Sequence, residues 1–315
     1  MSDLTALAMD LGGSHAACAV VRGDTIIARR DVLADGATDL GSLLPVLRET
    51  LFDLLKAAGI KCTECSAVVL GFCGIVSTRE KRVLATNKKF DDAPRLDLEA
   101  CFKEAFGLPF LLENDARLAL LGEHRFGAAR GTRDAVMVTL GSGIGGAALL
   151  DGRLLQSKHG LAGTMGGHLP VVLNGRLCSC GNLGCAEAEA STAFLPTIYR
   201  QQPNSSAGAL HDKTAIGFAE IFEAIDAGDE AAVAALEHCV AVWSALTVAL
   251  IHAYDPEVVV FGGSVLKRDR DILPRLQEFV NAHAWTLGRN VPLKTAALGS
   301  SAALLGAIPL MEYSL

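Results

Sequence analysis

Two glycine-rich runs in this chain of 315 residues have the residue types that bind phosphate. One is Asp10-Leu-Gly-Gly-Ser14, and the other is Gly141–Gly146, which follows Thr139. Glycines let the backbone turn tightly and offer N–H groups to an anion, and nearby hydroxyls add further donors. The predicted phosphate contacts are Gly12, Gly13, Ser14, Thr139, Gly141, Ser142 and Gly143. An ordinary hairpin turn remains the alternative for the first run.

A carboxylate accompanies the first glycine run, and its chemistry differs from that of the glycines. Asp10 would face the same spot as the phosphates. Two such anions repel one another unless a cation lies between them, so we expect Asp10 to hold Mg²⁺ through water.

The second glycine run also matches the spacing of a dinucleotide-binding fingerprint. That fingerprint requires the glycines to open a helix. Here Ala147–Leu150 runs into Asp151-Gly152 as a strand runs into a hairpin turn. We therefore predict a second phosphate-binding hairpin.

Asn114-Asp115 stands between an apolar strand, Pro109–Leu112, and a helical pattern that starts at Ala116. Ligands of open α/β sheets bind at the carboxyl ends of strands, where Asp115 would lie. Phosphoryl transfer to an alcohol needs a carboxylate that orients the hydroxyl and accepts its proton. Asp115 is thus the candidate general base, and simple capping of the helix is the alternative.

Three cysteines and one histidine form a compact set of potential metal ligands. They are Cys178, Cys180 and Cys185, with His168 ten residues before the first of them. Three thiolates and an imidazole are the ligands of a closed, structural zinc site. The pair Cys62-x-x-Cys65 lacks a second pair or a nearby histidine, and we interpret it as incidental.

The elements that must position these residues follow an α/β order. Apolar strands are predicted at Thr5–Asp10, Ser14–Arg22 and Thr25–Arg30, then a helix through Leu43–Leu55 and a strand at Ala67–Gly71. A further helix is expected after its cap, Asp97.

The opening pattern of strand, glycine turn, strand and hairpin occurs again from Ala135 onward, which predicts two related lobes. Long helical patterns follow at Ala215–Ile225 and Asp229–Tyr254. We expect an N-terminal α/β lobe over 1–115, with the helix at 300–315 packing back on it. The larger second lobe, with the zinc loop, would span 116–299.

Composition limits the function classes. Half of the residues are hydrophobic and the net charge is -7, which supports a large core and argues against a broad basic surface for nucleic acid. The longest apolar stretch, Val240–Ile251, is too short and too interrupted to span a bilayer. The start of the chain lacks a leader pattern, so we expect a cytoplasmic protein without a membrane partner.

Taken in order, these motifs resemble the ROK family (repressor, open reading frame, kinase), whose sugar kinases have a two-lobed actin-like ATPase fold. The resemblance spans nearly the whole chain and includes Glu187 and Gly262-Gly263. It implies ATP, Mg²⁺ and structural Zn²⁺ as cofactors and a homodimer or higher oligomer. It also implies phosphorylation of a hexose or N-acetylhexosamine, at the 6-hydroxyl, with Asp115 as base.

The resemblance further implies that sugar hydroxyls are bound by Gly74, Asn87, Asn114, Asp115, His168 and Glu187, and that Gly262 and Gly263 lie near the adenosine. His168 would serve both zinc and sugar. The family has a glutamate where this chain has Met165, which removes one hydrogen-bond acceptor for the sugar.

Two functions other than sugar phosphorylation are alternatives for a protein of this kind. Repressors of the family carry a DNA-binding segment before the first glycine motif, and only nine residues precede Asp10 here, so we expect no nucleic-acid partner. A catalytically silent sugar sensor is the second alternative, and Met165 is the residue that favours it.

Overall fold

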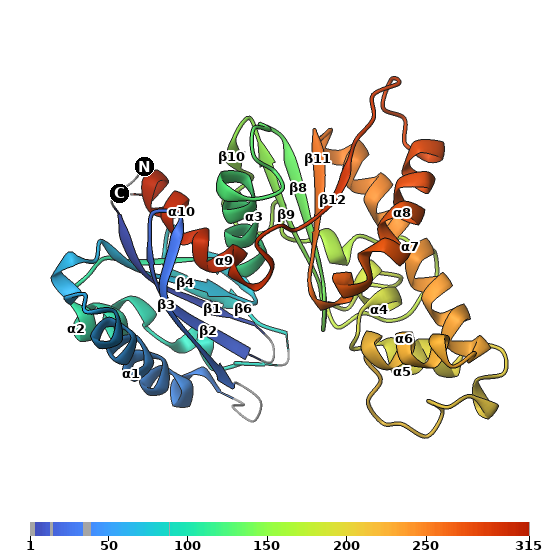
Figure 1. Cartoon of the computed structure of the whole chain (residues 1–315), viewed down its shortest axis with the longest axis horizontal. Helices are drawn as coiled ribbons and strands as arrows, with labels where there is room; N and C mark the ends of the chain where they lie inside the picture. Colours follow the sequence, from blue (N-terminus) through green and yellow to red (C-terminus); the bar gives the residue numbers. More distant parts are fainter. Residues whose placement is uncertain (1–3, 13–14, 34–38, 88, 315) are drawn as a thin grey trace. The chain divides into compact units, whose positions relative to one another are not determined.

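The computed structural model describes residues 4–12, 15–33, 39–87 and 89–314. They form two compact units (Figure 1). Unit 1 contains 1–132, 154–164 and 296–315, and unit 2 contains 133–153 and 165–295. The C-terminal segment 296–315 thus belongs to unit 1. The boundary differs from the expected one, because the helix after Asp115 belongs to unit 1.

Unit 1 is built on a five-stranded mixed sheet in the order β3-β2-β1-β4-β7. The first three strands are antiparallel, and β4 and β7 extend the sheet in parallel. A small hairpin, β5–β6, lies apart from this sheet. The strands are β1 (Thr5–Leu11), β2 (His15–Arg22), β3 (Thr25–Leu33), β4 (Ala67–Phe72), β5 (Ile75–Ser77), β6 (Arg82–Ala85) and β7 (Phe110–Asn114).

Burial follows position in the sheet. Central β4 is buried at every residue, whereas edge strand β3 has exposed residues along its length. A central parallel strand is covered on both faces, so it is apolar throughout. The helices of unit 1 are α1 (Leu40–Ala58), α2 (Leu98–Phe106), α3 (Asp115–Phe126), α9 (Ala302–Leu305) and α10 (Ala307–Ser314).

Close packing explains why α3 belongs to unit 1. A Cβ added to Gly122 would lie 2.1 Å from the Ala302 carbonyl oxygen, and one on Gly306 would lie 1.9 Å from that of Leu118. The backbones of α3 and the C-terminal helices therefore touch at glycines, a contact between distant segments that helical periodicity does not reveal.

Unit 2 repeats the sheet of unit 1, in the order β10-β9-β8-β11-β12, as the sequence predicted. An antiparallel hairpin is again followed by parallel strands. The strands are β8 (Ala135–Leu140), β9 (Ile144–Leu150), β10 (Arg153–Leu154), β11 (Val258–Gly262) and β12 (Leu293–Thr295). The helices are α4 (Ala186–Ala190), α5 (Leu195–Arg200), α6 (Phe218–Asp226), α7 (Glu230–Tyr254) and α8 (Asp269–His283).

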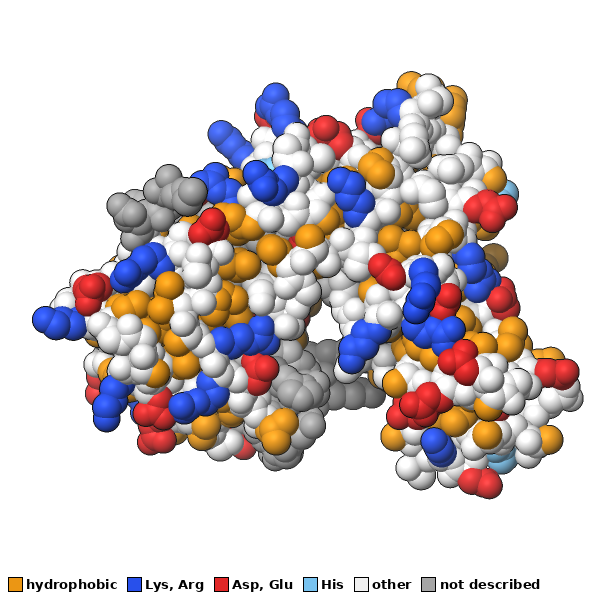
Figure 2. Space-filling view, viewed as in Figure 1, with side chains coloured by type: hydrophobic (Ala, Val, Ile, Leu, Met, Phe, Trp, Pro, Cys, Tyr) orange, Lys and Arg blue, Asp and Glu red, His pale blue; other side chains and the backbone are white. Residues whose placement is uncertain are grey.

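Helix α7 is long and apolar enough to cross a membrane by composition alone. Most of its apolar stretch is buried, and α4, α5, α6 and α8 pack against it. It therefore serves as the core helix of unit 2. Basic and acidic side chains both occur on the face drawn in Figure 2, and several basic ones lie close together along its upper edge.

Candidate active site

Asp115 occupies the corner where β7 ends and α3 begins. The cap of α3 is its neighbour Asn114, whose Oδ1 accepts a hydrogen bond of 3.2 Å from the Arg117 N–H. Asp115 is the first helical residue, so the alternative in which Asp115 is the cap is wrong. Its carboxylate is available for another role.

Two hydrogen bonds orient the Asp115 carboxylate. Asn114 Nδ2 and the Ala116 N–H each donate to Asp115 Oδ1, both at 2.9 Å. Burial raises the pKa of Asp115 to about 6, against the opposing effect of these hydrogen bonds. At neutral pH the group is therefore ionised and basic enough to accept a proton from an alcohol as its bond to phosphorus forms.

Asp10 lies on β1, opposite Gly71 of the parallel strand β4. A Cβ on Gly71 would lie 3.6 Å from Asp10 Oδ1, so the carboxylate lies over this glycine. Burial and then the charge of Asp115 raise the pKa of Asp10 to about 7, while Arg29 opposes the rise. Two carboxylates that disfavour one another's charge are suited to a shared cation.

Only part of the first glycine motif can be placed. Gly12 directly follows β1, at the end of the strand that carries Asp10. Gly13 and Ser14 lie outside the described residues, and their phosphate contacts stay a prediction.

Gly74 and Asn114, which were both predicted to bind the sugar, lie next to one another. Asn114 Nδ2 lies 3.2 Å from the Gly74 carbonyl oxygen and 3.4 Å from that of Phe72. A Cβ on Gly74 would lie 2.7 Å from the Ala85 carbonyl oxygen, which explains the glycine by packing. Asn87 is exposed just beyond β6. The side chain of Asn114 is thus engaged within unit 1, and its predicted contact with a sugar would require it to exchange a partner.

The second glycine run forms the turn of the β8–β9 hairpin in unit 2. The turn is Gly141–Gly143, closed by the Gly141 N–H on the Gly143 carbonyl at 3.0 Å. The chain continues as antiparallel strand β9, so the dinucleotide alternative is excluded. Thr192 and Ala193 N–H groups donate to the carbonyls of Gly141 and Ser142, at 3.0 and 3.1 Å.

Glu187, on α4, contacts this hairpin directly. Its Oε2 accepts from the Ile144 N–H at 3.0 Å, and a Cβ on Gly143 would lie 2.4 Å from the same oxygen. Gly143 is therefore needed for the approach of this carboxylate. The sequence placed Glu187 with the sugar and Gly143 with the phosphates, and the structure joins the two groups.

Gly262 and Gly263 lie beside the same hairpin. Gly262 ends β11 in register with Thr139 of β8. Gly263 has a φ of 101°, and a Cβ there would lie 2.0 Å from the Leu140 carbonyl oxygen. The structure therefore gathers the predicted nucleotide-binding residues of unit 2 at one end of its sheet.

The predicted zinc ligands converge in unit 2. The ligand atoms of His168, Cys178, Cys180 and Cys185 all lie within 4.8 Å of one another. Cys178 Sγ is 3.5 Å from His168 Nδ1, and Cys180 Sγ is 3.6 Å from Cys185 Sγ. A tetrahedral zinc ion with Zn–S bonds of about 2.3 Å places its sulfurs about 3.8 Å apart, so the donor set fits that ion.

The orientation of His168 matters for its second predicted role. Its Nδ1 faces the cysteines, which leaves Nε2 for another partner. Binding of a metal at Nδ1 would keep the proton on Nε2, where it can be donated to a hydroxyl.

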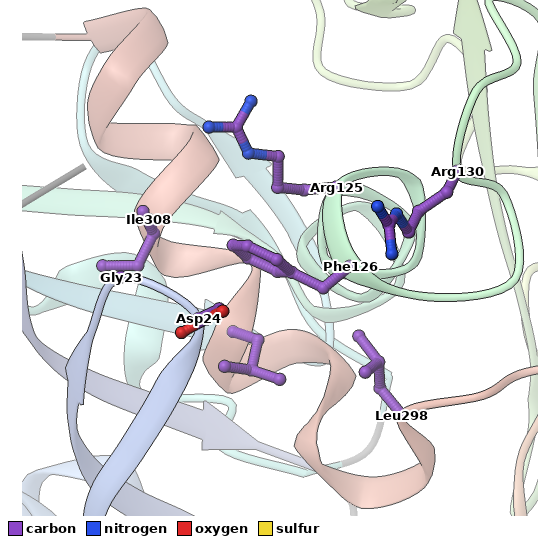
Figure 3. A pocket seen from close by; sticks show the side chains of 8 residues that line it. Gly23, Asp24, Arg125, Phe126, Arg130, Leu298 and Ile308 are labelled. Carbon is purple, nitrogen blue, oxygen red and sulfur yellow. The ribbon is translucent and has the colours of Figure 1, made fainter. Parts of the chain in front are cut away.

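A cavity of about 420 Å³ lies elsewhere in unit 1 (Figure 3). Phe126, at the end of α3, points toward Ile308 and the turn at Gly23-Asp24, and Arg130 comes from the loop that follows α3. None of the predicted site residues that the structure describes lines this cavity. It takes no part in the chemistry considered below.

Comparison with known proteins identifies the family. The family model described as "ROK family" matches residues 6–313. A glucokinase from Thermotoga maritima is 30% identical over 288 residues, which cover 89% of this chain and 88% of that enzyme. An N-acetylmannosamine kinase from Citrobacter koseri is 31% identical over 263 residues, covering 83% and 84%.

Solved structures agree with this assignment. A ROK hexokinase from Thermus thermophilus matches with a TM-score of 0.79 and 28% identity over 96% of this chain and 97% of that one. A ROK family glucokinase from Streptomyces griseus, in complex with glucose and AMPPNP, matches with a TM-score of 0.78 and 29% identity over 97% and 98%. The fold is the α/β actin-like ATPase fold that the sequence predicted. The chain belongs to the ROK family.

Proposed function

We propose that this ROK-family chain is an ATP-dependent sugar kinase. It transfers the γ-phosphoryl group of ATP to the 6-hydroxyl of a hexose or N-acetylhexosamine. The observation that carries the proposal is the corner at Asp115. Its neighbour Asn114 caps the helix, its Oδ1 takes both hydrogen bonds described for it, and burial raises its pKa to about 6.

In this proposal Asp115 orients the attacking hydroxyl and takes its proton as the new bond forms. Asp10 would hold Mg²⁺, and the cation would offset the repulsion between the charges of Asp10, Asp115 and the phosphates. Mg²⁺ would supply charge neutralisation on the transferred group.

The glycine turns are proposed to bind ATP through backbone N–H groups. In unit 2 the turn Gly141–Gly143 and the hydroxyls of Thr139 and Ser142 would face the phosphates, and Gly262-Gly263 the adenosine. The Gly141 and Ile144 N–H groups are not among these donors, because the Gly143 carbonyl and Glu187 already accept from them. In unit 1 Gly12, Gly13 and Ser14 would complete the phosphate contacts.

Zinc is proposed as a structural ion held by His168, Cys178, Cys180 and Cys185. All four positions of a tetrahedron are filled by protein, so the ion would stiffen its loop and activate no water. The loop then presents His168 Nε2 to a sugar hydroxyl.

The choice of sugar is proposed from relatives and from one residue. The two related kinases compared above are named as a glucokinase and an N-acetylmannosamine kinase. Met165 offers a sugar no strong hydrogen-bond acceptor. A binding pocket accepts or rejects a sugar hydroxyl according to whether the protein provides a hydrogen-bond partner for it. We expect a substrate that does not require a carboxylate at this point.

The test is ADP release with ATP and Mg²⁺ across hexoses and N-acetylhexosamines, beside Asp115→Asn. Turnover with at least one sugar, reduced by a factor of about 10³ or more in the variant, is the expected result. The variant keeps the volume and the acceptor at Oδ1, so circular dichroism should match the wild type.

A silent sugar sensor is the second candidate, and the apolar Met165 is the observation that favours it. Saturable sugar binding in calorimetry without ADP release, in zinc-loaded protein, would replace the kinase proposal with this one. Light scattering of the same sample tests the proposed homodimer or higher oligomer.

A further inference from the structure

Glu113 and Arg117 form a buried ion pair around the candidate base. Both side chains are at most 2% exposed, and Arg117 NH1 lies 3.2 Å from Glu113 Oε1. They stand two residues before and two residues after Asp115, on β7 and α3. No role for this pair followed from the sequence, because the four-residue spacing that pairs charges applies within a helix and Glu113 lies on a strand.

The pair is tied to one distant segment of unit 1, residues 155–162. Arg117 NH2 lies 3.1, 3.3 and 2.5 Å from the carbonyl oxygens of Leu155, Gly160 and Ala162. Gln156 Nε2 donates to Glu113 Oε2 at 2.8 Å. Both charged groups therefore hold the same segment.

Two further contacts fix the arrangement. Thr78 Oγ1 donates to Glu113 Oε2 at 3.0 Å, and the Asn114 N–H donates to Glu113 Oε1 at 2.9 Å. Gly160 has a φ of 75°, and a Cβ there would lie 2.5 Å from the Val76 carbonyl oxygen. The segment is thus pressed against the β5 strand on one side and bonded to the ion pair on the other.

Stability alone explains this pair poorly. A buried ion pair gains little over apolar side chains of similar volume, because both charges lose their hydration. The Nε of Arg117 is also buried without a hydrogen-bond partner in the described part of the chain, so the guanidinium is not fully satisfied. The arrangement does provide a fixed geometry, since the forked guanidinium of Arg117 binds three carbonyls and a carboxylate at once.

We propose that the Glu113–Arg117 pair is a positioning device for the reaction. It locks residues 155–162 to the β7–α3 corner and thereby holds Asp115 and its partner Asn114 in the orientation that proton transfer needs. Arg117 itself touches no substrate. This inference rests on the proposed function, because it assigns the pair to the base of that reaction.

The decisive variant is the double substitution Glu113→Gln/Arg117→Met, which removes both charges and keeps the volume. We expect it to unfold at a somewhat lower temperature, because three carbonyl oxygens lose their donor, but to stay folded at the assay temperature by circular dichroism. Its kcat should fall about 10- to 100-fold, since small displacements of a reacting group have effects of this size. The KM for ATP should change less than twofold. An unchanged kcat would overturn the proposal.

A second readout does not depend on turnover. Amide hydrogen exchange in peptides covering 155–164 should become at least tenfold faster in Arg117→Met, and exchange in unit 2 should not change. Arg117→Lys keeps the charge but loses the fork, so it should show the same local effect. Exchange at the wild-type rate in both variants would show that the pair does not hold the segment.

Arg125→Met is the matched control on the same helix. Arg125 is about half exposed and pairs with Glu312 at 3.5 Å on the surface, so neither kcat nor exchange of 155–164 should change. If the wild type phosphorylates no sugar, the proposed function fails on its own. The positioning role is then measured as loss of sugar affinity by calorimetry in the double variant, and wild-type affinity would refute it.

Discussion

Replacing the candidate base should stabilise the protein while it removes activity. The pKa of Asp115 is raised from 3.8 to about 6, so the folded protein binds a proton at this carboxyl more tightly than the unfolded chain does. Such a group lowers stability as pH rises from about 4 to 6, and the loss stays constant above that range. Asp115→Asn removes this penalty, since the amide carries no charge to desolvate.

The size of the effect follows from the shift. A difference of about two pKa units corresponds to about 3 kcal/mol at pH 8. Asp115 is half-buried, so we discount the value for solvent screening to about 1–2 kcal/mol. At pH 5, where Asp115 is largely protonated when folded, about half of the gain should remain.

Urea unfolding of the ligand-free protein and of Asp115→Asn at pH 5 and pH 8 measures this difference. Exposed Asp212→Asn is the control for the loss of one charge, and it should change stability at neither pH by more than about 0.5 kcal/mol. Equal stability of wild type and Asp115→Asn at pH 8 would refute the reasoning, as would a gain that does not shrink at pH 5.

Three further predictions concern the same site. The kcat should rise with pH through about 6 and then level off, because the base must be ionised, and a flat profile from pH 5 to 8 would contradict that role. Purified protein should contain one zinc ion per chain, measured by mass spectrometry, and Cys185→Ser should lose the ion and unfold at a temperature about 5 °C lower. A wild-type protein that contains no zinc and is as stable as a zinc-treated sample would exclude the site. Gly143→Ala should lower the stability of the ligand-free protein by about 1–3 kcal/mol, because the added methyl group clashes with Glu187. Gly141→Ala is the control and should have a smaller effect, because a Cβ there meets no atom within 4 Å. Equal effects of the two variants in calorimetry would show that the contact between Gly143 and Glu187 is not tight.

The sequence alone determined those features that depend on short spacing. The repeated pattern of strand, glycine turn and hairpin predicted two similar sheets, and both have the same strand order. The zinc ligands lie within 18 residues, so a single loop can bring them together. The cap at Asp97 and the strand Ala135–Leu140 were also predicted correctly, because a capping side chain and a short apolar run that ends at glycines are local signals.

Tertiary structure decided the features that depend on distant backbone groups. Glycine contacts between helices assigned α3 to unit 1, and Asn114 rather than Asp115 became its cap. The Ile144 N–H, 43 residues away in sequence, fixed the position of Glu187. The guanidinium of Arg117 bonds to carbonyl oxygens of residues 155–162, which lie about 40 residues further along the chain. Every residue carries a backbone C=O group and every residue except proline an N–H group, so residue type does not mark which of them a buried side chain will meet.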